Sequence, residues 1–113
     1  MAITIATSSP QQLLDNIKKA IANDKIKTWD VDGDGDFTHT AQQWRYRAWL
    51  RPRVSTGSLR LTILAPKDTT MSKATYAIYH GRFIESVLSH FDEQVSSLHA
   101  SAMPEEGDIV KGS

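Results

Sequence analysis

One long stretch of alternating apolar and polar residues runs from residue 44 to residue 66 and reads WRYRAWLRPRVSTGSLRLTILAP. Aromatic and β-branched side chains recur at every second position, a pattern typical of strands that bury one face. The short segment Ser55-Thr-Gly57 near its middle has the composition of a turn. We therefore predict a β-hairpin formed by the strands Trp44–Val54 and Ser58–Pro66.

The first strand of this hairpin would sort its side chains onto two faces. One face would carry Trp44, Tyr46, Ala48 and Leu50, which we expect to meet the core. The other face would meet water or a partner, and Arg60 would join it from the second strand. The residues expected on this outer face are Arg45, Arg47, Trp49, Arg51, Arg53 and Arg60.

Two helices are predicted, one before the hairpin in the sequence and one after it. Residues 10–23 follow Ser9, a favourable N-cap residue, and Pro10, which is well placed in a first helical turn. Apolar residues then recur at helical spacing, and the same period returns over residues 72–92. Both segments should pack an apolar stripe against the sheet.

Three further strands are expected, at residues 27–31, 37–40 and 94–103. The predicted order is α-β-β-β-β-α-β, which indicates an α+β protein. Its antiparallel sheet would have four to five strands, with two helices packed on one face.

A chain of 113 residues is typical of one domain, which we place at residues 1–104. Residues 105–113 are polar and acidic, so we predict a flexible tail. The final Gly112-Ser113 resembles a cloning remnant.

The composition argues against several classes of function. Thirteen basic residues balance thirteen acidic ones, so no overall field attracts nucleic acid or an anionic membrane. Cysteine is absent, which excludes disulfides and thiolate chemistry and fits a cytoplasmic protein. No apolar run approaches the ~20 residues that a membrane-spanning helix needs. We expect a protein that does not contact membranes.

Four aspartates alternate in the segment Asp30-Val-Asp-Gly-Asp-Gly-Asp36. Counted from Asp30, it resembles the first nine positions of an EF-hand calcium loop, with Gly35 at the sixth. Position 12 is Ala41, where an EF-hand has a bidentate glutamate, and the flanking segments are predicted strands. Two interpretations stay open, a solvated turn and a weak Ca²⁺ site. The candidate metal ligands are Asp30, Asp32, Asp34, Asp36 and Thr38.

The arginines and the tryptophan of the outer face indicate recognition of a macromolecule. Cations beside aromatic rings on a sheet are typical of single-stranded nucleic-acid binding, but the motifs of the common RNA-binding sheets are missing. A plain solvated face is the other alternative. We predict a non-enzymatic binding module, monomeric or homodimeric, whose partner is a protein with an acidic surface. It needs no cofactor unless Ca²⁺ binds weakly.

A small hydrolase is the third class considered. His39 follows the aspartates and has the chemistry of a metal ligand or a base. Ser86 and His90 are one helical turn apart, which brings a hydroxyl near an imidazole. A domain of this size has little material for a concave pocket, so such a site would have to be assembled at a dimer interface.

Overall fold

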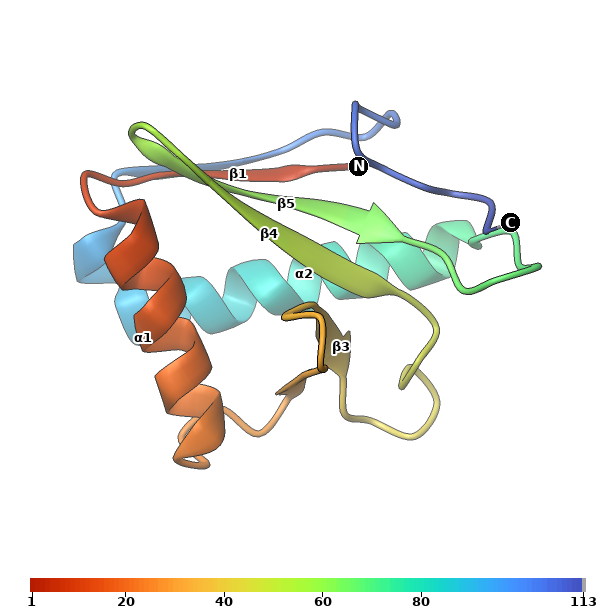
Figure 1. Cartoon of the computed structure of the whole chain (residues 1–113), viewed down its shortest axis with the longest axis horizontal. Helices are drawn as coiled ribbons and strands as arrows, with labels where there is room; N and C mark the ends of the chain where they lie inside the picture. The colour runs from red at the N-terminus through yellow and green to blue at the C-terminus, as the bar shows by residue number, and fades with distance from the viewer. Residues whose placement is uncertain (113) are drawn as a thin grey trace.

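An antiparallel sheet carries two helices on one of its faces in the computed structural model, which describes residues 1–112 (Figure 1). Within these residues the strands are β1 (Ile3–Ala6), β2 (Trp29–Val31), β3 (Phe37–His39), β4 (Trp49–Ser55), β5 (Ser58–Leu64) and β6 (Ser97–Ala100). Their spatial order is β2-β3-β4-β5-β1-β6. The helices are α1 (Pro10–Ala22) and α2 (Lys73–Phe91), and a 3-10 turn, Asp92–Gln94, follows α2. The predicted α+β class with an antiparallel sheet and two helices is confirmed, although the described sheet has six strands.

The core lies between the sheet and the helices. Alternate residues of the central strands are fully buried on this side, including Ile3 and Ile5 of β1 and Leu61 of β5. The helices supply Leu13, Ile17, Tyr79, Phe83 and Val87, all of which are buried. Each large apolar side chain buried in this way contributes roughly 1.5–3 kcal/mol relative to an exposed one. Within residues 1–112, both α-helices pack on this face, and the opposite face of the sheet carries neither.

The prediction that a strand begins at Trp44 is wrong, because β4 begins at Trp49. Tyr46 has a φ of +60°, a left-handed conformation that extended strands do not adopt. Its amide donates to the Thr38 hydroxyl at 3.1 Å, and the Tyr79 hydroxyl donates to the Trp44 carbonyl. These contacts with distant residues hold residues 41–48 in turns, so the sheet face is shorter than predicted.

Strand β1 was absent from the predicted order, although it lies inside the sheet. Ile3 pairs with Leu61 of β5 on one side and with Ala100 of β6 on the other. The four residues Ile3–Ala6 alternate in burial as a half-buried strand should. Their brevity concealed the pattern, because four residues give only two buried positions.

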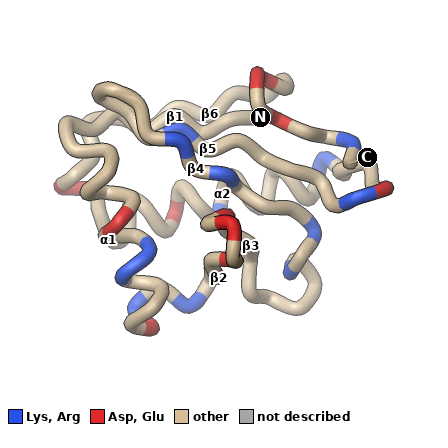
Figure 2. Tube along the Cα trace, in the orientation of Figure 1, with Lys and Arg blue, Asp and Glu red and all other residues tan. Residues whose placement is uncertain are grey.

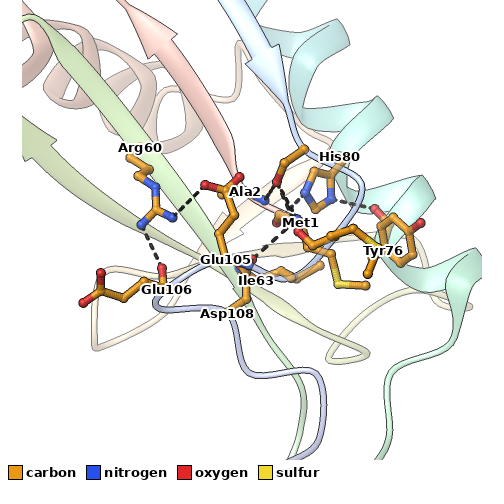
Figure 3. Close-up of polar contacts among 11 residues, drawn as sticks. Met1, Ala2, Arg60, Ile63, Tyr76, His80, Glu105, Glu106 and Asp108 are labelled. Atoms are coloured by element: carbon orange, nitrogen blue, oxygen red, sulfur yellow. Dashed lines mark hydrogen bonds and ion pairs between the residues drawn. The ribbon is translucent and has the colours of Figure 1, made fainter.

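The segment from residue 105 to residue 112, predicted to be a flexible tail, lies beside the end of β5. The Ile109 amide donates to the Ile63 carbonyl at 2.9 Å, and the Ala65 amide donates to the Ile109 carbonyl at 2.7 Å. The Asp108 carboxylate accepts the Ile63 amide at 2.9 Å (Figure 3). The segment thus supplies β5 with hydrogen bonds beyond the point where β1 begins.

Gly112 fits closely against the loop that follows β5. A Cβ atom at this position would lie 1.9 Å from the Pro66 carbonyl oxygen. The Gly112 amide also donates to the Thr69 carbonyl at 2.9 Å. A role as a cloning remnant does not explain these contacts, and Ser113 lies outside the described residues.

Neither α1 nor α2, the two α-helices within residues 1–112, is long and apolar enough to cross a bilayer.

Candidate protein-binding face

Three arginines from two neighbouring strands lie on the sheet face that no helix covers. Arg51 and Arg53 alternate with the buried Leu50 along β4, and Arg60 lies on β5 between the buried Leu59 and Leu61. Figure 2 shows basic positions along these two strands. We call Arg51, Arg53 and Arg60 the arginine face. The alternation that predicted an outward-facing set of arginines therefore holds for these three residues.

Arg51 forms a two-bond ion pair with Asp36. Its Nε donates to Asp36 Oδ1 at 3.1 Å and its Nη2 donates to Oδ2 at 2.8 Å. The carboxylate is almost fully buried, whereas half of the Arg51 side chain is exposed. The pKa of Arg51 is raised, chiefly because the side chain donates to Asp36. This pair attaches β4 to the turn between β2 and β3. The Asp36 carboxylate also compensates much of the positive charge of Arg51.

Arg60 contacts the segment that follows β6. Its Nη1 donates to the Glu106 carbonyl at 2.9 Å, and its Nη2 lies 3.4 Å from Glu105 Oε1 (Figure 3). A hydrogen bond with the Ser101 hydroxyl, and secondly the contact with Arg60, holds the pKa of Glu105 below its ordinary value. An acidic piece of the chain itself thus occupies part of the arginine face.

A groove of about 510 Å³ lies on this face, between the arginines and the terminal segment. Its apolar lining comes from Pro52, Leu64 and Ile109. Gly107 lies against the floor, where a Cβ atom would be 2.9 Å from the Thr62 methyl carbon. The groove therefore offers cationic groups beside an apolar strip.

Sequence reasoning missed the wall of this groove that residues 106–109 form. The segment was predicted to be a mobile tail, so it was not placed next to the arginines. The apolar pair Ile109-Val110 within an otherwise polar stretch is the signal that could have suggested packing.

Of the three other residues expected on this face, Arg45 and Arg47 precede β4, whereas Trp49 belongs to β4 and shares the face of Arg51 and Arg53. Arg45 pairs with Asp30 at 2.9 Å and lies over the Tyr46 ring, 5.1 Å from its centroid. Arg47 belongs to the turn that precedes β4. Trp49 is half-buried and stacks on Tyr46, with ring centroids 6.4 Å apart. Four of the six expected residues, Trp49 and the three arginines, therefore lie at strand positions that share this face, whereas Arg45 and Arg47 do not.

The aspartate segment forms the turn between β2 and β3. Carboxylate oxygens of Asp32, Asp34 and Asp36 all lie within 4.8 Å of one another. Two predicted ligands lie outside this group: Asp30 pairs with Arg45, and Thr38 is buried. The Thr38 hydroxyl donates to the Ala48 carbonyl at 3.1 Å.

Two of the remaining carboxylates, Asp32 and Asp36, already have partners that stabilise a turn. Asp32 Oδ1 accepts the amides of Asp34 and Asp36, each at 2.9 Å. Gly35 has a φ of +83°, as the tight reversal of the chain requires. Both Asp36 oxygens accept from Arg51. These contacts support the interpretation of a turn, and Ca²⁺ binding stays a prediction.

The residues considered for hydrolysis have structural partners. His39 is buried, and its Nδ1 accepts the Ala41 amide at 3.0 Å. Burial, and secondly the Arg82 charge, lowers the pKa of His39 below its ordinary value. The Ser86 hydroxyl accepts from the indole of the buried Trp29 at 3.2 Å. A hydrolase at a dimer interface stays a prediction without support from these contacts.

No family model matches this chain, and comparisons with curated proteins and with solved structures found no match.

Proposed function

We propose that this protein is a non-enzymatic binding module that recognises an acidic surface of another protein through its arginine face. One observation carries the proposal: Arg51, Arg53 and Arg60 line one groove on the sheet face that the helices leave open. Arginine is favoured at protein interfaces because its planar guanidinium group donates several directed hydrogen bonds to carboxylates. A mixed cationic and apolar groove suits an acidic partner that also carries apolar side chains.

A protein partner fits these features better than a nucleic acid does. Nucleic-acid binding needs several uncompensated cations along a phosphate backbone, together with aromatic rings for stacking bases. Asp36 already compensates Arg51, and Glu105 partly compensates Arg60. Trp49 is half-buried and already stacks on Tyr46, so less of its ring is open to a base. The net charge of zero also favours a protein partner, because a neutral protein has no overall field that attracts nucleic acid.

The test is a charge reversal at Arg53, which is exposed and has no ion pair among residues 1–112. Immobilised wild type and Arg53→Glu would be exposed to the same native extract, and retained proteins would be quantified by mass spectrometry. Arg47→Glu is the matched control, because Arg47 is also exposed and unpaired within this part of the chain but lies outside the groove. Thermal unfolding of all three proteins checks that each one folds.

We expect a partner that Arg53→Glu loses and Arg47→Glu retains, and that cross-links near residue 53 through an acidic segment. The proposal fails if charge reversal at Arg53 leaves the set of retained proteins unchanged, or changes it no more than reversal at Arg47.

A further inference from the structure

Arg53 and Arg60 are opposite each other in the sheet register. Like charges directly opposite on paired strands repel each other and are unfavourable. The same row continues through Thr4 of β1 to His99 of β6, and neither residue supplies a negative charge. The free protein therefore keeps an electrostatic repulsion on its open face that an anionic ligand would relieve.

The chain relieves this repulsion only in part. Glu105 approaches Arg60 at 3.4 Å, and 40% of its side chain is exposed. Exposed ion pairs of this kind contribute little stability, so another carboxylate exchanges with Glu105 at small cost. Arg53 has no ion pair within the described part of the chain. The side chain of Glu105 thus shows where a carboxylate from a partner would bind.

The spacing of the cations matches an extended ligand. Arg51 and Arg53 are two residues apart on one strand, so their side chains leave β4 about 7 Å from each other. Carboxylates on alternate residues of an extended peptide have the same spacing. Arg51 binds Asp36 through Nε and Nη2, which leaves its other guanidinium hydrogens able to donate to a ligand. The apolar lining residues Leu64 and Ile109 are bridge partners, and Leu64 lies opposite Trp49, two residues before Arg51 on β4.

We infer that the groove takes an extended acidic peptide with carboxylates at alternate positions and one apolar residue near Leu64 and Ile109, and that this peptide displaces Glu105 from Arg60. The inference rests on the proposed function and specifies its ligand. It also gives Glu105 and Glu106 a regulatory role, because their contacts with Arg60 compete with the partner.

The experiment is a fluorescence anisotropy titration at low ionic strength. The probe is a labelled peptide in which one leucine precedes glutamates at every second position, with serine between them. A control peptide has the same composition with its glutamates consecutive. Wild type, Glu105→Gln and Arg53→Gln are compared, with Arg47→Gln as the matched surface variant. A single-stranded oligothymidine of equal charge tests for nucleic acid.

We expect the alternating peptide to bind several-fold more tightly than the control peptide. Glu105→Gln should tighten binding by a few fold, because it removes the internal competitor, and Arg53→Gln should weaken it by about five- to tenfold. Arg47→Gln should match wild type.

Equal affinities for the two peptides, or for wild type and Glu105→Gln, would overturn the inference. The proposed function would still stand if Arg53→Glu loses its protein partner. Tighter, Arg53-dependent binding of the oligothymidine would overturn both.

Discussion

His39 is buried with one ring nitrogen hydrogen-bonded, and its Nε2 has no hydrogen-bond partner among residues 1–112. Its ring packs edge-on against Trp29, with centroids 5.3 Å apart. Because Nδ1 accepts an amide hydrogen, the fold favours the neutral imidazole with its proton on Nε2. The sequence suggests a metal ligand or a base at this residue, yet its contacts are those of a packed core side chain.

The stability of the protein should depend on pH through His39. Its folded pKa lies below the ordinary value of 6.5, so below this pH the unfolded chain binds a proton that the folded protein does not. The free energy of unfolding should therefore be fully present above pH 6.5 and fall as the pH drops towards the folded pKa. Urea unfolding at about pH 7.5 and about pH 5.5 measures this loss.

A His39→Gln variant serves as the control, because glutamine can still accept the Ala41 amide but does not titrate. We expect its loss of stability between the two pH values to be smaller than that of wild type. An identical loss in both proteins would assign the pH dependence to other groups.

Among the elements, the helices were predictable to within a residue or two. The predicted helices 10–23 and 72–92 correspond to α1 (Pro10–Ala22) and α2 (Lys73–Phe91). Their apolar spacing is local information, and Ser72 caps α2 by accepting the Thr75 amide. Strand β5 was likewise clear, because its alternation extends over seven residues.

Elements governed by distant contacts were not predictable from local pattern. The alternation of residues 44–48 favoured a strand, but hydroxyl groups of Thr38 and Tyr79 bind the backbone of this segment and hold it in turns. The conformation of residues 105–112 likewise depends on hydrogen bonds with β5, which the local sequence does not reveal. The arginine face was predicted in part, because Arg51, Arg53 and Arg60 lie in strands whose alternation the structure retains.

Gly112→Ala tests whether the terminal segment belongs to the packed structure. The new methyl group would overlap the Pro66 carbonyl oxygen, a backbone atom that cannot rotate away. We expect a loss of about 1–3 kcal/mol in the free energy of unfolding, as for overpacked sites, measured by urea denaturation. Amide exchange at Ile109 should also accelerate.

The control is Gly33→Ala, where a Cβ atom would meet nothing within 4 Å. It should change stability by less than about 0.5 kcal/mol. If Gly112→Ala and Gly33→Ala were equally mild, the contacts of residues 105–112 would contribute nothing measurable.

For the whole molecule, the decisive feature is the position of β1 between β5 and β6. It joins residues that are far apart in the chain, since Ile3 pairs with both Leu61 and Ala100. Such non-local pairing generally slows folding, because long loops must close before the contacts form. The first strand of the sequence therefore joins β6 to the rest of the sheet.

A pair of neighbouring substitutions in β1 tests this arrangement. Ile5 is fully buried beneath the helices, whereas Thr4 lies on the open face. We expect Ile5→Ala to cost about 2–5 kcal/mol in the free energy of unfolding. Thr4→Ala should cost less than about 1 kcal/mol. Equal effects, measured by chemical denaturation, would show that β1 does not bury one face in a central strand.

The same position of β1 has a consequence for biosynthesis. A ribosome adds about 5–20 residues per second, so Ile3 and Ile5 leave the exit tunnel seconds before Leu61 and Ala100 are made. Until β5 is made the nascent strand lacks both of its neighbours, and until β6 is made it still lacks one. We expect it to be a contact site for chaperones that hold unfinished chains, until translation releases the last strand.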